Sequence, residues 1–225
     1  MYRNINAICL SIILILPTSL CITEKRELKE VDKIIMLPEP RYTSNKSVEE
    51  AILERRSIRE YSEKNLSLEE ISQILWAAQG ITYRPKGFRT APSAGALYPM
   101  EIYVVTKEGI YHYDPWTHSL EQKYAGDVRK NLSKAALDQE WVREAPVDII
   151  ITAVFERTKR KYGERGERYV YMEAGHVAQN IYLQCVSLNL GTTVVGAFYD
   201  DEVQEVLKLP SDHKPIYIMP VGHKR

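Results

Sequence analysis

The chain has few cysteines and no excess of charge of either sign. Its 3 cysteines are Cys9 and Cys21 near the N-terminus and Cys185 far along the chain, which gives no even set of spaced pairs. We therefore expect no structural disulfide in the folded part. The 30 Lys and Arg residues balance 30 Asp and Glu residues, so the protein has no global basic field to hold a nucleic acid or a membrane surface. Any anion-binding site must be local.

The common nucleotide-binding and zinc-protease motifs are also absent. The sequence has no Gly-x-Gly-x-x-Gly, no Gly-x-x-x-x-Gly-Lys-Ser/Thr and no His-Glu-x-x-His. Glu173 and His176 have the spacing of half a carboxylate-bridged metal site, but no other histidine has a glutamate three residues before it. We therefore predict no metal, and we interpret this pair as a polar contact inside the fold.

The composition is that of a globular protein with one sizeable domain. Its 225 residues are 44% hydrophobic and 27% charged, which favours a packed core. At the N-terminus, residues 4–23 carry no charge, Arg3 precedes them, and residues 8–16 are almost entirely aliphatic. This layout predicts a signal peptide or membrane anchor over residues 1–23, so that the protein is exported or membrane-anchored. The alternatives are a buried helix or strand, and initiation at Met36, which would give a cytoplasmic protein.

Residues 24–46 are charged and then punctuated by proline, which is typical of a linker and lead-in. The domain is predicted to span residues 47–225. Ser47 with Glu50, and Ser67 with Glu70, have the spacing of capping boxes at which two helices begin. The second of these helices is predicted to end at Gly80.

Further elements follow from the hydrophobic patterns. We expect a hairpin of strands over 101–105 and 110–113, a helix over 128–137, a central strand over 147–154, a long buried helix over 169–190, a strand over 192–198, a short helix over 200–209 and a last strand over 216–219. Strands and helices mix without regular alternation, so the predicted class is α+β, with a mixed sheet flanked by helices.

Four separate segments could together hold one phosphorylated, flat cofactor. Two are basic, namely Arg55, Arg56 and Arg59, and His223, Lys224 and Arg225, and arginine offers several donors to phosphate oxygens. The other two, residues 92–95 and 195–197, contain glycine and offer backbone amides for a close approach. Either basic cluster alone would be interpreted as solvated surface charge.

Five motifs occur in a characteristic order. They are Arg-Arg-Ser-Ile-Arg-Glu-Tyr at 55–61, Pro-Ser-Ala-Gly-Ala-Leu-Tyr-Pro at 92–99, Glu-Ala-Gly-His-Val-Ala-Gln-Asn-Ile-Tyr-Leu at 173–183, Val-Gly-Ala-Phe at 195–198 and Met-Pro-Val-Gly at 219–222. Together they resemble the FMN-binding nitroreductase superfamily, and in particular its SagB-type branch, which includes thiazole- and oxazole-forming dehydrogenases. The similarity covers nearly all of residues 37–225.

This resemblance implies a homodimer with two FMN sites at the interface, each lined by both chains. Arg55, Arg56 and Ser57 would hold the ribityl phosphate, and Arg59 would face the pyrimidine edge and stabilise the reduced flavin. Further residues would complete each site: Ser93, Ala94 and Gly95 from the partner chain, the amides of Gly196 and Ala197 at flavin N5 and O4, and Lys224 and Arg225 at the phosphate. The terminal carboxylate of Arg225 would repel that phosphate.

Lys161 and Tyr162 resemble a Lys-Tyr pair that transfers protons in the azoline-oxidising members. Arg157, Lys159, Arg160 and Arg165 surround the pair in sequence, and positive charge favours a lower pKa for both side chains. The alternative is a solvated basic loop.

The predicted function is that of an FMN-dependent oxidoreductase. FMN would pass a hydride through its N5 atom from a reduced donor, such as NAD(P)H, to a small organic acceptor. The alternatives are an azoline-type ring dehydrogenase acting on a modified peptide, and a non-catalytic exported flavin-binding protein.

Overall fold

The computed structural model describes residues 28–225. Its main sheet has seven strands in the order β1-β6-β5-β4-β7-β9-β8. They are β1 (Lys29–Met36), β4 (Met100–Thr106), β5 (Gly109–Asp114), β6 (Ser119–Ala125), β7 (Val147–Ala153), β8 (Leu190–Thr192) and β9 (Lys214–His223). A separate hairpin pairs β2 (Ile81–Tyr83) with β3 (Phe88–Arg89). The sheet differs from the predicted mixed sheet in that each of its pairings is antiparallel, because hairpins and long returns bring each strand back against its neighbour.

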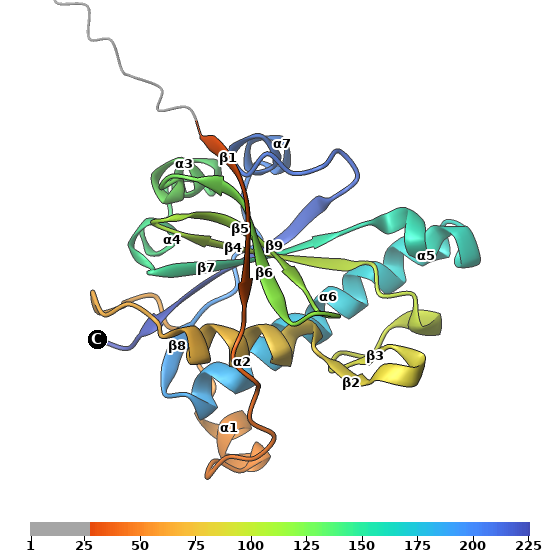
Figure 1. Ribbon diagram of the computed structural model, residues 1–225, viewed down its shortest axis with the longest axis horizontal. Helices are drawn as coiled ribbons and strands as arrows, with labels where there is room; N and C mark the ends of the chain where they lie inside the picture. Colours follow the sequence, from red (N-terminus) through yellow and green to blue (C-terminus); the bar gives the residue numbers. More distant parts are fainter. Residues whose placement is uncertain (1–27) are drawn as a thin grey trace, which may run out of the picture.

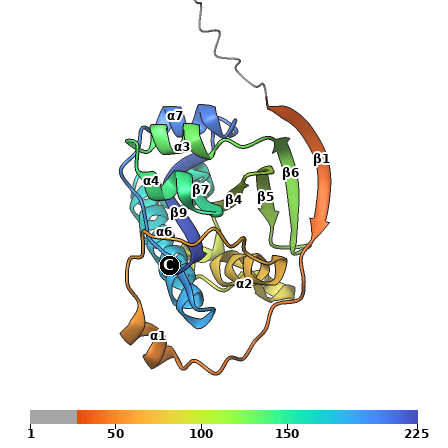
Figure 2. The same ribbon diagram turned by 90° about the vertical axis from the view of Figure 1, so that its left-hand side faces the viewer.

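Helices cover both faces of this sheet (Figures 1 and 2). They are α1 (Val48–Glu54), α2 (Leu68–Gln79), α3 (Arg129–Ala135), α4 (Glu140–Glu144), α5 (Phe155–Tyr162), α6 (Arg165–Ser187) and α7 (Asp200–Val206), with the short 3₁₀ turns η1 (Arg84–Lys86) and η2 (Ala94–Ala96). Every residue of β7 is buried. Ile149 and Ile151 join the core with α2 and α6, whereas Ile150 joins the core with α3, α4 and α7. This alternation confirms the predicted α+β class and the central strand.

The two capping boxes form as the sequence predicts. At α1 the Ser47 hydroxyl accepts from the Glu50 amide at 3.1 Å, and the Glu50 carboxylate accepts from the Ser47 amide at 2.7 Å. Ser67 and Glu70 repeat this exchange at α2, which ends at Gly80. The caps satisfy backbone amides that have no partner within the first turn, so these helix starts are decided locally.

The long helix α6 is buried on one side only. Ten of its 23 residues are buried, but Tyr171, Met172 and Gly175 are exposed. The prediction of a buried helix is therefore wrong for one face, and the helix begins and ends several residues earlier than predicted. Small and apolar residues on an exposed face of a helix are available for contact with another chain.

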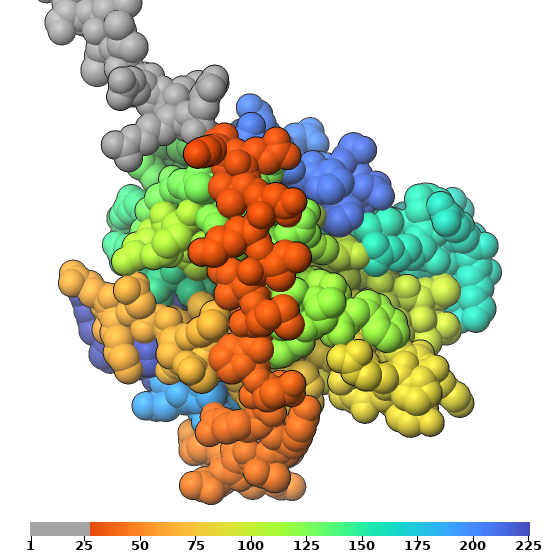
Figure 3. Space-filling model, viewed as in Figure 1, coloured from red at the N-terminus to blue at the C-terminus, as the bar shows by residue number. Residues whose placement is uncertain are grey.

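Residues 29–36 form the edge strand β1, although the sequence suggests a linker there. β1 pairs with β6 from Lys29 opposite Ala125 to Met36 opposite Ser119, and it lies across the surface of the molecule (Figure 3). Its side chains are mostly exposed, and only Ile35 packs against the core. Because an edge strand of this kind buries little apolar surface, hydrophobic patterns did not reveal it. Residues 1–23 lie outside the described part of the chain.

This strand changes what we expect from N-terminal truncation. A chain that begins at Leu28 retains β1, whereas a chain that begins at Leu37 leaves the edge of β6 unpaired. We expect the shorter chain to lose about 2 kcal/mol or more of unfolding free energy, from ladder hydrogen bonds and the burial of Ile35. Urea unfolding of the two truncated proteins measures the difference. Equal midpoints would show that β1 contributes nothing, and would leave initiation at Met36 compatible with a complete fold.

Candidate active site

The segment after α1 lies against the last strands of the sheet. The Ile58 amide donates to the Thr192 carbonyl at 2.9 Å, the Ser62 amide donates to the His223 carbonyl at 2.9 Å, and Tyr61 bridges to Lys224. The fold thus brings together the two basic clusters that the sequence singles out. Both clusters are near the C-terminus in space, at the end of the sheet opposite β1 (Figure 2).

Two paired glycines allow this segment to pack closely against strands β8 and β9. Gly191 of β8 is the register partner of Gly222 of β9. A Cβ on Gly191 would lie 2.7 Å from Ile58, and a Cβ on Gly222 would lie 2.8 Å from the Cβ and Cγ atoms of Tyr61. The Tyr61 hydroxyl donates to the carbonyls of Ile58 at 2.7 Å and Pro220 at 3.2 Å. Glycine is therefore required at both positions to seat residues 58–61.

Tyr182 of α6 organises the side chains at the start of the segment. Its hydroxyl accepts from the Val194 amide at 2.8 Å and shares a 3.0 Å hydrogen bond with the Ser57 hydroxyl. The Arg55 guanidinium lies over the Tyr182 ring, 5.1 Å from its centroid. Arg56 turns back to the end of α1, where it donates to the carbonyls of Leu53 and Arg55. Tyr182 is a site residue that the sequence pattern did not indicate, although it lies nine residues after Glu173 in the third of the five motifs.

The remaining predicted residues of this group border the same segment. The Arg59 guanidinium lies 5.4 Å from the centre of the Trp141 ring on α4. Gly196 and Ala197 are exposed after the bridge between Val195 and Ile218, and within residues 28–225 neither of their amides donates a hydrogen bond. At the C-terminus Lys224 reaches Asn189 at 3.4 Å, and Arg225 is exposed. We call this set of residues the basic shelf: Arg55, Arg56, Ser57, Arg59, Gly196, Ala197, Lys224 and Arg225.

Ser93, Ala94, Gly95, Lys161 and Tyr162 form a second group. Gly95 has φ +63°, a left-handed conformation that favours glycine. A Cβ at this position would lie 2.8 Å from Lys161 Nζ and 2.8 Å from the Tyr162 hydroxyl. The two side chains therefore converge on one point beside the Gly95 turn. This convergence is a geometry in which one of them could move a proton to or from a ligand at the turn.

Lys161 and Tyr162 lie at the end of helix α5, whereas the sequence predicts a basic loop. The helix forms because Thr158 is buried and because α6 approaches it closely at Gly166, where a Cβ would lie 2.8 Å from the Lys159 amide nitrogen. Such tertiary contacts override the weak hydrophobic pattern of this charged segment.

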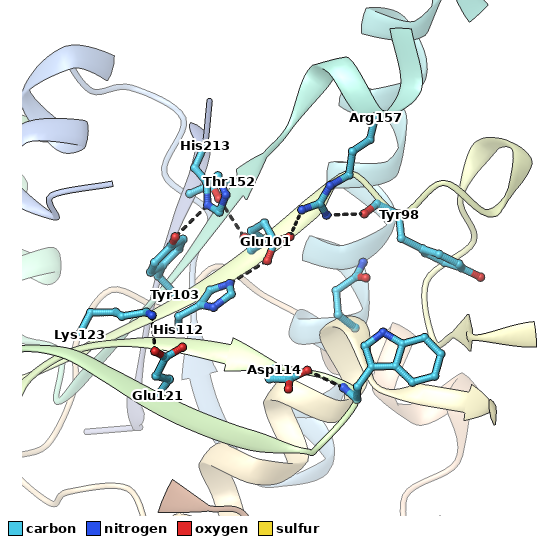
Figure 4. Close-up of polar contacts among 12 residues, drawn as sticks. Tyr98, Glu101, Tyr103, His112, Asp114, Glu121, Lys123, Thr152, Arg157 and His213 are labelled. Carbon is cyan, nitrogen blue, oxygen red and sulfur yellow. Dashed lines mark hydrogen bonds and ion pairs between the residues drawn. The ribbon is translucent and has the colours of Figure 1, made fainter. Parts of the chain in front are cut away.

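A partly buried ion-pair network fixes the start of α5 (Figure 4). Arg157 pairs with Glu101 of β4 at 2.5 Å and donates to the Tyr98 carbonyl at 3.1 Å. His112 of β5 also contacts Glu101, at 2.7 Å. Burial alone would raise the pKa of Glu101, but the hydrogen bond to His112 and the charge of Arg157 lower it to about 2. Arg157 thereby ties α5 to the chain just after the Gly95 turn. In the sequence, Arg157 stands out only as part of a charged run.

The two groups lie toward opposite ends of α6. The Gly95 turn contacts the helix near Glu173, which Ser93 adjoins, and the basic shelf contacts it at Tyr182. Nine residues of α-helix span about 13 Å. Figure 1 shows α5 and the C-terminus on opposite sides of the molecule.

Within residues 28–225, no cluster of three metal-ligating side chains is present, and no helix has the length and apolarity needed to cross a membrane.

Comparison with known proteins identifies the fold and the family. The Nitroreductase family matches residues 52–223, which include both groups. The chain belongs to the nitroreductase family. A solved nitroreductase-type structure from Ralstonia eutropha superposes with a TM-score of 0.77 at 30% identity, covering 88% of this chain and 99% of that one.

The chain is also similar to three proteins whose names describe different activities. It is 50% identical over 183 residues to the nitroreductase-type protein MJ1384 of Methanocaldococcus jannaschii, covering 79% of this chain and 91% of that protein. It is 27% identical to the microcin B17-processing protein McbC of Escherichia coli, covering 66% of this chain and 59% of McbC. It is 26% identical to an FMN reductase [NAD(P)H] of Bacillus subtilis, covering 77% and 64%. These relatives confirm the resemblance drawn from the sequence and support a flavin oxidoreductase.

Proposed function

We propose that this protein is an FMN-dependent oxidoreductase that takes a hydride from a reduced nicotinamide and delivers it to a small organic acceptor. The observation that carries the proposal is the basic shelf, where two basic clusters meet beside the paired glycines Gly191 and Gly222. The exposed amides follow Val195, which pairs with the same strand β9 at Ile218. FMN, when bound, would supply the hydride transfer. The protein supplies binding, orientation and charge.

The residues of the basic shelf fit the parts of FMN. Arg55, Ser57 and Lys224 offer donors to a phosphate, and Arg56 has donors left after it caps α1. The exposed amides of Gly196 and Ala197 suit the polar edge of a flavin ring. Arg59, held against Trp141, supplies a positive charge. Arg225 extends the basic surface at the C-terminus.

We also propose a homodimer, because the Gly95 turn lies about 13 Å along α6 from the basic shelf of the same chain. A second chain would bring its own Ser93, Ala94 and Gly95 to this shelf. The exposed Tyr171 and Met172 of α6 provide apolar surface for such a contact. Light scattering that detects an FMN-loaded monomer would contradict this part of the proposal.

The central test is flavin binding. We expect the purified protein to be yellow, with one non-covalent FMN per subunit, and we expect Arg55→Ala to weaken FMN binding about 10-fold to 100-fold. The reason is that a hydrogen bond to a charged group contributes about 1.5–3 kcal/mol. Fluorescence titration of the apoprotein with FMN measures the dissociation constant. Lys134→Ala on α3 is the matched control, since it removes one exposed positive charge elsewhere.

Arg59→Ala tests the other end of the cofactor. It should lower the reduction potential of bound FMN, because a nearby cation favours the negative charge of the reduced form. An unchanged potential would refute this role for Arg59. A colourless protein that takes up no FMN would refute the proposed function as a whole.

The convergence of Lys161 and Tyr162 beside Gly95 favours a second candidate, a dehydrogenase that oxidises a saturated ring in a peptide. Such a reaction removes a hydride to the flavin and a proton to a base. We expect Tyr162→Phe to lower the turnover of a ring substrate by about 10²-fold to 10⁴-fold. Tyr169→Phe is the control, since it removes a hydroxyl from a neighbouring tyrosine whose ring centroid lies 5.1 Å from that of Tyr162. Equal rates in both variants would exclude Tyr162 from proton transfer.

Turnover separates an enzyme from a flavin-binding protein. A protein that binds FMN but is neither reduced by any donor nor reoxidised would favour the non-catalytic alternative.

Export or membrane anchoring through residues 1–23 remains a proposal, and cell fractionation of the full chain tests it.

A further inference from the structure

Glu173 is a buried carboxylic acid beneath the Gly95 turn. It lies on α6 with 2% of its surface exposed, and within residues 28–225 its Oε1 atom has no hydrogen-bond partner. Burial raises its pKa to about 7, although the adjacent Ser93 hydroxyl and Arg89 act to lower it. A carboxyl group in this setting can be either neutral or ionised near physiological pH.

The Ser93 hydroxyl connects Glu173 to the turn. Its oxygen accepts a hydrogen bond from the Tyr98 amide at 2.9 Å, and it has a single proton to donate. When Glu173 is ionised, that proton is attracted to the carboxylate. When Glu173 is protonated, the acid itself can donate to the Ser93 oxygen, and the hydroxyl proton is then free to point away from α6, toward a ligand at the turn.

We propose that Glu173 controls the Ser93 hydroxyl, so that Ser93 donates a hydrogen bond to a flavin ring at the Gly95 turn only while Glu173 is protonated. This inference rests on the proposed function. It makes Glu173 a positioning residue, because it acts on the ligand through Ser93.

The other charged groups of this region surround Arg89 of β3. The Arg89 guanidinium donates to Gln79 of α2 at 2.7 Å and lies over the Tyr98 ring. Burial lowers the pKa of Arg89, Glu101 opposes this shift and Arg157 adds to it. The arginines keep their charge across the neutral range, and Glu101, with a pKa of about 2, stays ionised. Two histidines lie nearby: His112, which contacts Glu101, and His176, which is exposed one turn after Glu173 on α6. His112→Gln and His176→Gln are therefore necessary controls.

The experiment is a fluorescence titration of the full-length protein with riboflavin between pH 5.5 and 8.5. Riboflavin has the ring of FMN without a phosphate, which would itself titrate near pH 6. For wild type we expect the dissociation constant to rise about 3-fold to 10-fold from the acid to the alkaline end, which corresponds to the loss of one hydrogen bond. His112→Gln and His176→Gln should each keep this rise.

Three variants test whether Glu173 acts through its protonation state or only as part of the packed structure. Glu173→Gln should bind tightly at every pH, because its amide donates to Ser93 permanently. Ser93→Ala should bind weakly at every pH, and Ser93→Thr, which keeps the hydroxyl, should restore the rise. An affinity independent of pH in wild type, or an unchanged rise in Glu173→Gln or Ser93→Ala, would overturn the inference while flavin binding stands. No binding of riboflavin or FMN at any pH would instead overturn the proposed function.

Discussion

Gly222→Ala is expected to destabilise the protein by about 1–3 kcal/mol and to weaken FMN binding by more than about 10-fold. The added Cβ would lie 2.8 Å from two atoms of Tyr61, and such overpacking forces backbone or side-chain shifts of this cost. Tyr61 cannot move freely, since its hydroxyl is bound to the carbonyls of Ile58 and Pro220. Displacement of Tyr61 would therefore move residues 55–59, which carry the proposed phosphate contacts.

Chemical denaturation and FMN titration measure the two effects. Lys134→Ala on α3 is the control, because its side chain is exposed and belongs neither to the basic shelf nor to the exposed face of α6. A surface substitution of this kind usually changes the free energy of unfolding by less than about 0.5 kcal/mol, so the control should be nearly neutral in both measurements. If Gly222→Ala bound FMN as tightly as wild type, the seat of residues 55–61 would not depend on the paired glycines.

Asp148→Asn is expected to be more stable than wild type at neutral pH, by an amount that grows as pH rises. Asp148 of β7 has 0% of its surface exposed, and within residues 28–225 neither of its side-chain oxygens has a partner. Burial raises its pKa well above 3.8, although Arg129 opposes the shift. Above pH 3.8 the unfolded chain releases this proton while the folded chain retains it, so stability falls by up to about 1.4 kcal/mol per pH unit until the folded pKa is reached.

Urea unfolding of both proteins from pH 4 to pH 8 tests this expectation. The two stabilities should agree near pH 4 and diverge above it. Asp127→Asn provides a control, because a hydrogen bond from Arg129 lowers the pKa of Asp127. Its contribution is lost only as pH falls below about 4, so this variant should be less stable than wild type by a nearly constant amount between about pH 5 and pH 8. A parallel pH dependence in wild type and Asp148→Asn would mean that Asp148 is ionised and paired.

Local signals in the sequence predicted two helix starts and the central strand. The capping boxes at Ser47 and Ser67 set the starts of α1 and α2, and the largely apolar run at 147–154 identified the central strand. The order of five motifs indicated the family, and two of these motifs contain the glycines at 95 and 222, where a Cβ would lie 2.8 Å from neighbouring side chains. The capping boxes, the apolar run and the motifs each consist of residues close together in the chain, so a single sequence reveals them.

Only the tertiary structure decided the rest, since it depends on contacts between distant residues. The strand β1 forms because β6, about 90 residues later, offers it an unpaired edge, and α5 forms because Gly166 and Glu101 hold it in place. The neutral-range pKa of Glu173 likewise arises from burial beneath Ser93, some 80 residues away. No spacing in the sequence predicts these contacts, because their partners are far apart in the chain. Only the packed chain brings β1 to the edge of β6, Ser93 to Glu173, and Ile58 and Tyr61 to the paired glycines.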